Sequence, residues 1–152
     1  MDTNWPQGHL PKRSIIIDTR EQLPYEFPDS IRQKLDQGDY SLREMEHVVA
    51  VERKSIQDLV GSLTSGRKRF EREMERLQSE VRWPWLLVES SVSQIAAGGF
   101  MHSKANPRSI LGSLFAWTMR YGVLLLPACD RAHAQASTAM ILRLAETELE
   151  RE

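Results

Sequence analysis

The amino-acid sequence predicts an α/β fold in which helices flank a central mixed β-sheet. Short runs of β-branched and apolar residues alternate along the chain with longer segments whose apolar residues recur three or four positions apart. With 152 residues and 41% hydrophobic content, the chain has enough apolar material for one core. We therefore expect a single domain at residues 14–152, preceded by an N-terminal extension at residues 1–13.

The first part of the predicted sheet begins at residues 14–17, a β-branched run that ends at a polar cluster. Residues 22–37 contain two prolines and are expected to form a loop, with at most a helical turn at residues 30–35. Residues 40–43 and 48–54 then form a predicted β-hairpin.

The second part of the chain alternates helices and strands. Asn106 and Asp130 are expected to cap the last two helices, because their side chains accept hydrogen bonds from free backbone N–H groups. The expected elements in chain order are helices at residues 56–63 and 67–81, a strand at 85–89, a helix at 107–121, a strand at 123–126 and a helix at 131–150.

Composition excludes several classes of protein. The longest apolar runs, at residues 85–88 and 122–128, are too short to cross a bilayer, and the N-terminus lacks an apolar signal segment. We therefore expect a cytoplasmic protein that has no membrane partner. A net charge of -1 argues against coating of nucleic acid by bulk charge, although a local basic patch is compatible with it.

The single cysteine, Cys129, has no partner for an internal disulfide. We find no cysteine or histidine at metal-like spacing near it and expect a packed small residue rather than a zinc ligand. The four histidines, at positions 9, 47, 102 and 133, are scattered and receive no role.

Charged residues at the end of the second hairpin strand indicate chemistry. Side chains two apart on a strand share a face, so Glu52 and Lys54 point the same way. A second carboxylate from the neighbouring strand, Asp39, would complete an oxygen site for a hard cation such as Mg²⁺. A lysine beside such a site can orient or polarise an attacking water. Nucleases with a restriction-endonuclease-like core use this layout of an acid followed by Glu-x-Lys.

A longer motif surrounds these residues, and it resembles the signature of the XPF-type structure-specific nuclease family. The matching residues are Gly38-Asp39, Glu52-Arg53-Lys54 with Asp58, the upstream Asp18-Thr19-Arg20-Glu21 and the downstream Gly66-Arg67. The resemblance implies a restriction-endonuclease-like core that cuts DNA with Mg²⁺ or Mn²⁺ and works as a homodimer on branched, flapped or forked DNA. Unlike larger members of that family, which carry additional modules, this chain is expected to be a stand-alone, single-domain member.

Carried over by position, the resemblance implies that Asp18, Asp39 and Glu52 bind metal while Lys54 acts on the water. Arg20, Arg53 and Arg67 would lie near phosphate. Three further acids are left open as supporting residues: Glu21, which is either a partner of Arg20 or a ligand; Asp58, which also fits a capping box with Ser55; and Glu89 at the end of a strand.

The helix at residues 67–81 opens with three cations, where the helix dipole disfavours positive charge. Arg67 and Arg69 therefore indicate a phosphate site at this N-terminus, where free backbone N–H groups would help to hold the anion. The alternative is a solvated helix face on which Arg67 pairs with Glu71.

The helix at residues 107–121 carries two apolar stripes, and a single core contact covers only one of them. The second stripe, with apolar residues of the last helix, predicts a homodimer. The alternative is that both stripes pack within one chain. Two other functions also stay open: a catalytically silent DNA-binding dimer partner, and a nuclease of the same core with restriction or junction-resolving specificity.

Overall fold

The computed structural model describes residues 10–100 and 103–152. His9, His102 and most of the predicted N-terminal extension lie outside these residues. Within the described part of the chain, one six-stranded sheet has the order β2-β1-β3-β4-β5-β6. Its strands are β1 (Ile15–Ile17), β2 (Ser30–Arg32), β3 (Tyr40–Leu42), β4 (Val49–Lys54), β5 (Trp83–Val88) and β6 (Leu124–Pro127).

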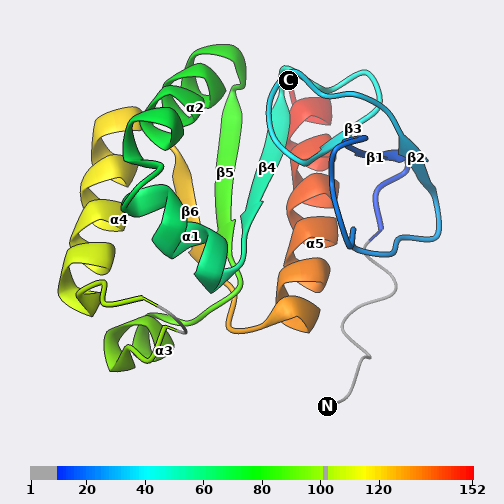
Figure 1. Cartoon of the computed structure of the whole chain (residues 1–152). Coiled ribbons are helices and arrows are strands. Elements are labelled where there is room, and N and C mark those ends of the chain that lie inside the picture. Colours follow the sequence, from blue (N-terminus) through cyan, green and yellow to red (C-terminus); the bar gives the residue numbers. More distant parts are fainter. Residues whose placement is uncertain (1–9, 101–102) are drawn as a thin grey trace.

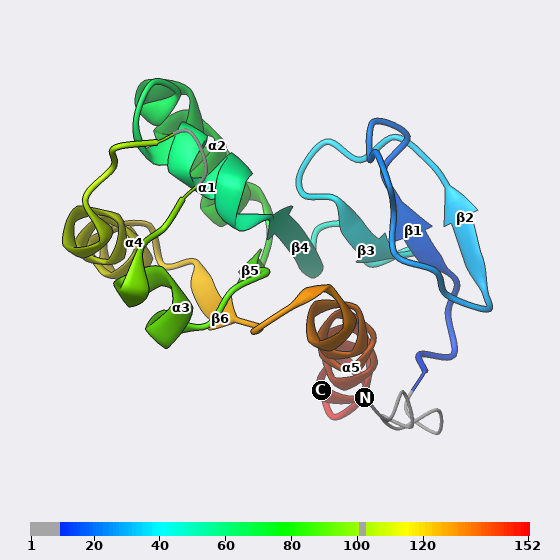
Figure 2. The same ribbon diagram turned by 60° about the horizontal axis from the view of Figure 1, so that its bottom comes forward.

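Helices cover both faces of the sheet (Figures 1 and 2). They are α1 (Ile56–Leu63), α2 (Arg67–Glu80), α3 (Val92–Ala97), α4 (Pro107–Tyr121) and α5 (Arg131–Glu150). Apolar residues of α1, α2 and α4 pack with Ala50, Leu86 and Val88 on one face of the sheet. On the other face, α5 packs with apolar residues of β1, β3, β4 and β5. The predicted α/β architecture is confirmed.

The predicted hairpin is present, since β3 and β4 pair antiparallel with Tyr40 opposite Val51. The prediction of a loop at residues 22–37 is wrong, because β2 lies there and pairs parallel with β1. This strand consists of Ser30, Ile31 and Arg32 and has two exposed side chains, so it carries no apolar alternation. Backbone hydrogen bonds to β1 define it instead, including Ile15 N–H to the Asp29 carbonyl at 3.0 Å.

Two further differences concern the second half of the chain. Strand β5 begins at Trp83, two residues earlier than expected, because Trp83 pairs with Val49 of β4. Helix α3 was not predicted. Its signal is a capping box in which Ser91 accepts from the Gln94 N–H and the Gln94 side chain accepts from the Ser91 N–H.

Strands β4, β5 and β6 run parallel, so their carboxyl ends lie at one edge of the sheet. The Glu89 N–H donates to the Lys54 carbonyl at 2.9 Å, and the Ala128 N–H donates to the Val88 carbonyl at 2.8 Å. The chain after each of these strands is therefore held beside its neighbour. In α/β sheets, this edge is where functional loops gather.

Helix α4 presents its two apolar stripes to different surroundings. Ile110, Leu114 and Trp117 are buried in the core. Phe115 is 46% exposed and Met119 is 80% exposed. The alternative in which both stripes pack within one chain is therefore wrong for these two side chains.

Helix α5 also holds the end of the N-terminal segment. The buried carboxylate of Glu146 accepts hydrogen bonds from the backbone N–H groups of Lys12 and Arg13, at 2.8 and 3.0 Å. Arg13 and Arg143 add ion pairs to the same carboxylate. Among the described residues, the helices are either too short or too polar to span a lipid bilayer.

Candidate active site

Asp39 and Glu52 lie beside each other where the chain enters β3 next to the end of β4. The Asp39 N–H donates to the Val51 carbonyl at 2.8 Å, and the Arg53 N–H donates to Asp39 Oδ2 at 2.8 Å, so Asp39 is bonded to the residues on both sides of Glu52. Gly38 allows this approach: its φ is +77°, and a Cβ there would lie 3.0 Å from Cβ of Ala50. The glycine before Asp39 is therefore required by both backbone conformation and space.

The two carboxyl groups are electrostatically coupled. Burial raises the pKa of Asp39 to about 7, although the Arg53 backbone N–H, which donates to Asp39 Oδ2 at 2.8 Å, acts in the opposite direction. Burial also raises the pKa of Glu52 well above its ordinary value, and repulsion from Asp39 adds to the effect. Such raised values mark acids that lack sufficient positive charge nearby.

Lys54 lies on the same side of β4 as Glu52, toward α2, with its ammonium 4.9 Å from the centre of the Phe70 ring. A groove of about 400 Å³ opens in front of it between α1 and α2. Arg69, Asp58 and Glu73 contribute to its walls. The groove is therefore lined by both cations and acids next to the coupled carboxyl groups.

Glu73 is a site residue that the sequence analysis missed. Its charge also raises the pKa of Glu52, and it forms an ion pair with Arg69 at 3.5 Å. Its position three residues after the buried Phe70 on α2 was the available signal, because residues three apart on a helix lie on neighbouring parts of its surface.

Asp18 is buried at the end of β1, and both of its carboxylate oxygens have donors. The Leu35 N–H donates to Oδ1 at 2.8 Å, and the Arg20 guanidinium donates to Oδ2 at 2.9 Å. Burial opposes ionisation, but these hydrogen bonds hold the pKa of Asp18 below its ordinary value. Asp18 thus closes the loop that contains β2, while the Arg20 side chain is 66% exposed.

Arg53 points to the opposite side of β4 and connects two of the acids whose roles were left open. Its guanidinium donates to Glu89, and to Glu21 at 3.1 Å, and lies 4.7 Å from the centre of the Tyr25 ring. Only 13% of its side chain is exposed. Glu21 also accepts from the Tyr40 hydroxyl at 2.7 Å. The structure therefore places Glu21 and Glu89 with Arg53, and Arg20 with Asp18.

The two arginines at the start of α2 differ in their surroundings. Arg67 donates to the Ser113 hydroxyl at 3.0 Å and lies over the Trp117 ring, which connects α2 to α4. Arg69 has an 82% exposed side chain and forms an ion pair with Glu73. Glu71, the partner of Arg67 in the alternative of a solvated helix face, pairs with Arg120 instead.

Ser55 caps α1, as its hydroxyl accepts from the Asp58 N–H at 3.2 Å. This is half of the expected capping box. The Asp58 side chain lies in the wall of the groove in front of Lys54.

The sequence pattern of the ERCC4 domain matches residues 17–141. The chain belongs to the ERCC4 domain family. This confirms the resemblance inferred from the motif, and the match includes all of the proposed catalytic residues.

This ERCC4 domain is 31% identical over 134 residues to the DNA repair endonuclease XPF of Cricetulus griseus, and shows the same identity over the same length to that of Mus musculus. Each alignment covers 81% of the chain and 14% of the relative. The DNA repair endonuclease UVH1 of Arabidopsis thaliana is 30% identical over 140 residues, covering 85% of the chain and 14% of that relative. The chain thus spans a small part of these proteins.

Solved structures share the fold. XPF from Aeropyrum pernix superposes with a TM-score of 0.65 at 22% identity, covering 91% of this ERCC4 domain and 66% of that chain. The same protein in complex with DNA gives a TM-score of 0.66 at 22% identity, covering 92% and 66%. The restriction-endonuclease-like core is therefore confirmed.

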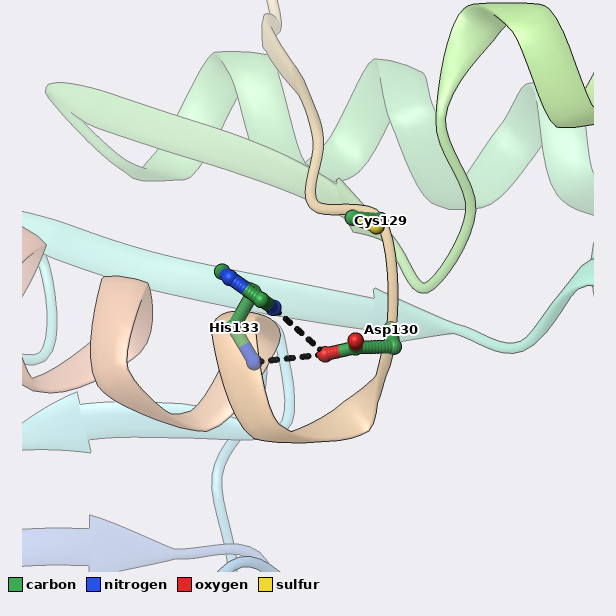
Figure 3. A group of neighbouring side chains, drawn as sticks. All are labelled: Cys129, Asp130 and His133. Carbon is green, nitrogen blue, oxygen red and sulfur yellow. Dashed lines mark hydrogen bonds and ion pairs between the residues drawn. The ribbon is translucent and has the colours of Figure 1, made fainter. Parts of the chain in front are cut away.

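A second group of polar side chains in this ERCC4 domain contradicts the sequence analysis. Cys129 is exposed rather than packed. Its sulfur, a carboxylate oxygen of Asp130 and a ring nitrogen of His133 all lie within 4.8 Å of one another (Figure 3). His133 follows Cys129 by four positions, and the turn into α5 brings them together. The expectation of no ligand spacing near Cys129 was wrong.

Proposed function

We propose that this ERCC4 domain is a divalent-metal-dependent DNA endonuclease that hydrolyses phosphodiester bonds. The observation that carries the proposal is the adjacent pair of Asp39 and Glu52, with Lys54 on the same side of β4 as Glu52. Burial raises the pKa of both acids, and repulsion from Asp39 raises that of Glu52 further. The names of the curated relatives, which are DNA repair endonucleases, support this choice.

The carboxyl pair fits a hard divalent cation. Lys54 is the cation whose charge opposes the raised pKa of both groups, and that charge leaves both values high. Asp39 and Glu52 would hold Mg²⁺ or Mn²⁺, which accept carboxylate oxygens and waters. When bound, such an ion acidifies a water molecule and offsets negative charge on a phosphoryl oxygen.

Asp18 is the third proposed ligand. Its Oδ2 is held by Arg20, whose side chain extends into solvent. A phosphate that attracts the guanidinium of Arg20 would leave this oxygen with only the Arg20 backbone N–H as donor, at 3.3 Å, so substrate and metal would favour each other's binding. In this arrangement Arg20 contacts the DNA backbone, as the sequence analysis expected.

Lys54 carries the remaining chemistry in the proposal. Its ammonium donates a hydrogen bond that orients the attacking water or stabilises the phosphoryl oxygen on which charge develops. As the water oxygen bonds to phosphorus, the phosphorus–oxygen bond to the leaving nucleotide breaks. The water gives up a proton to solvent, and the leaving oxygen takes one up from solvent. Arg53 holds Glu21 and Glu89 on the other side of β4, so we assign it to positioning the strand rather than to phosphate.

The N-terminus of α2 is the proposed contact for a DNA phosphate beside the groove. Gly66 provides no side-chain cap, and no acidic residue lies in the first turn. Free backbone N–H groups there favour an anion. Arg69 is exposed over the same groove and adds its charge.

We also propose that the domain works as a homodimer on branched, flapped or forked DNA. Phe115 and Met119 of α4, Leu124 of β6 and Leu144 of α5 are exposed apolar side chains. Helix α4 packs beside the edge strand β6, and the chain after β6 leads into α5 (Figure 2). A two-fold contact there would join two sites in one particle, which suits a substrate with two duplex arms.

The central test is a cleavage assay on linear, flap, fork and four-way DNA with and without Mg²⁺. Cleavage should need the ion. Asp39→Asn and Lys54→Ala should each lower turnover by at least about a hundredfold, as expected for a lost catalytic group, while binding of flap DNA persists. Lys34→Ala, which removes an exposed lysine outside the groove, is the matched control.

Wild-type turnover by Lys54→Ala would refute the assignment of the site. Binding without cleavage of any substrate would favour the silent DNA-binding partner. Preference for a short linear sequence or for the four-way junction would instead identify restriction or junction-resolving specificity.

A further inference from the structure

Three different metal-binding side chains converge where β6 leads into α5. Cys129 supplies a thiol, Asp130 a carboxylate and His133 an imidazole, and their donor atoms lie within 4.8 Å of one another. Figure 3 shows the carboxylate and the imidazole directed toward each other, with the cysteine on the loop above them. None of the three belongs to the carboxylate pair on β3 and β4.

The backbone holds two of these side chains in place. The Asp130 carboxylate caps α5 by accepting from the His133 N–H at 2.9 Å, and its Oδ1 lies 2.7 Å from His133 Nδ1. The Asp130 N–H also donates to the Ala128 carbonyl at 2.7 Å, which closes a tight turn. Cys129 is the central residue of this turn and has a φ of +65°. A non-glycine residue rarely adopts this left-handed conformation. The tight turn therefore fixes Cys129 beside the helix start.

The donor set selects a class of metal. Thiolate and imidazole are ligands of zinc and similar transition metals, whereas magnesium prefers oxygen alone. Three protein ligands leave a fourth position for water or another ligand. Cys129 also lines a cavity of about 730 Å³ between α1 and α3, together with Glu89 and Ser90. An ion bound by the cysteine would have access to solvent through that cavity.

We propose that Cys129, Asp130 and His133 bind one zinc-class transition-metal ion. The Cys129 thiol loses its proton on binding, and the contact between His133 Nδ1 and Asp130 is exchanged for bonds to the ion. The His133 N–H keeps the carboxylate at the helix start. This site is independent of the proposed nuclease chemistry.

The test uses Co²⁺ as a spectroscopic probe in the full chain carrying Asp39→Asn and Glu52→Gln, which removes both charges of the carboxylate pair. Because the chain has one cysteine, a thiolate-to-cobalt charge-transfer band reports Cys129 alone. We expect one equivalent of Co²⁺ to produce this band, Zn²⁺ to displace it, and excess Mg²⁺ to leave it unchanged.

Cys129→Ser should abolish the band, and Cys129→Ser and His133→Gln should each weaken Zn²⁺ binding by at least about tenfold. Asp130→Asn retains a capping side chain and tests the carboxylate separately. His47→Gln is the matched control, because it replaces an exposed histidine that lies between β3 and β4. Absence of the band at stoichiometric Co²⁺, or unchanged Zn²⁺ affinity in both Cys129→Ser and His133→Gln, would overturn the proposal. Circular dichroism confirms that each variant is folded.

Discussion

The ionised form of Asp39 lowers the stability of the folded protein when no metal is bound. Its pKa in the folded chain is about 7, above the ordinary value of 3.8. A raised carboxyl pKa contributes stability below the unfolded value, and this stability is lost as pH rises through the folded value. The Glu52 pKa is shifted in the same direction. The free energy of unfolding without metal should therefore fall between about pH 4 and pH 8.

Asp39→Asn tests this pH dependence, because asparagine can still accept the hydrogen bond from the Arg53 N–H. In EDTA, we expect the variant to be more stable than wild type by about 1–2 kcal/mol at about pH 8, after allowance for solvent screening, and by less at about pH 5. Denaturant titration at both pH values provides the measurement, and Asp36→Asn, in an exposed acid, is the control. An advantage independent of pH would contradict this account.

Arg53 is a structural cation, and its loss should be severe. It is 13% exposed and pairs with Glu21 and Glu89, so Arg53→Ala leaves two carboxylates without their partner. Removal of one side of a buried ion pair costs about 3–5 kcal/mol. Thermal unfolding of Arg53→Ala should show this loss, while the exposed Arg43→Ala should change stability by less than about 0.5 kcal/mol.

A rescue experiment separates this role from a DNA contact. Replacing Glu89 by Gln in the Arg53→Ala background should recover part of the lost stability, because one buried charge is removed. If Arg53→Ala unfolds at the wild-type temperature but binds DNA with a smaller salt dependence, the phosphate role expected from the sequence would be correct instead.

At the scale of single residues, the sequence identified the proposed chemistry but not all of its surroundings. The proximity of Asp39 and Glu52 follows from the predicted β-hairpin, which brings the residue before one strand beside the end of the other. Glu73 was missed because a helix must be docked on the sheet before one of its many charged residues can be selected. Cys129 and His133 were missed because their proximity depends on a turn with an unusual backbone conformation.

Helix α2 carries two arginines, Arg67 and Arg69, to which we assign different roles, and substitutions can distinguish them. Arg69→Ala should lower the slope of log affinity against log salt by about one unit, as for one lost phosphate contact, with little change in stability. Arg67→Ala should instead destabilise the fold by about 1 kcal/mol, because it loses the Trp117 ring and the Ser113 hydroxyl. Fluorescence titration of flap DNA in EDTA gives the slopes.

Arg76→Ala is the control for Arg69→Ala, since Arg76 is exposed on the same side of α2, two turns farther from Gly66. Its slope should match that of wild type. An unchanged slope for Arg69→Ala, or a reduced slope for Arg67→Ala at unchanged stability, would reverse the roles assigned to the two residues.

At the scale of elements, caps and apolar periodicity were sufficient for the long helices. Helix α4 begins after Asn106 and has the expected bounds, and Asp130 caps α5. Strand β2 could not be predicted from caps or apolar periodicity, because this short edge strand is defined by hydrogen bonds to β1 rather than by its own side chains. Helix α3 has only 6 residues, which is too short for a helical period to be recognised in the sequence.

Four large apolar side chains of α4, β6 and α5 are exposed to solvent. Met119, Phe115, Leu144 and Leu124 are 80%, 46%, 53% and 40% exposed. They come from α4, α5 and β6, and β6 is one of the two edge strands of the sheet within the described residues. Exposed apolar side chains near an unpaired strand edge favour association, and a two-fold axis through β6 would bury the same residues on both copies.

Light scattering tests this homodimer directly. At tens of micromolar protein, the dimer should show about twice the chain mass of 17.5 kDa. Met119→Asp should shift the mass toward that of the monomer, because a charge at the centre of the interface loses hydration without a partner. Leu23→Asp is the matched control, since Leu23 is also 80% exposed but belongs to the loop after β1 rather than to α4, β6 or α5. A wild-type monomer at this concentration would contradict the dimer, whereas equal dissociation by both variants would place the interface elsewhere.

If Met119→Asp alone gives a folded monomer, the same variant shows whether flap cleavage requires two sites in one particle. Loss of cleavage with retained metal binding would support that requirement, and wild-type turnover would exclude it.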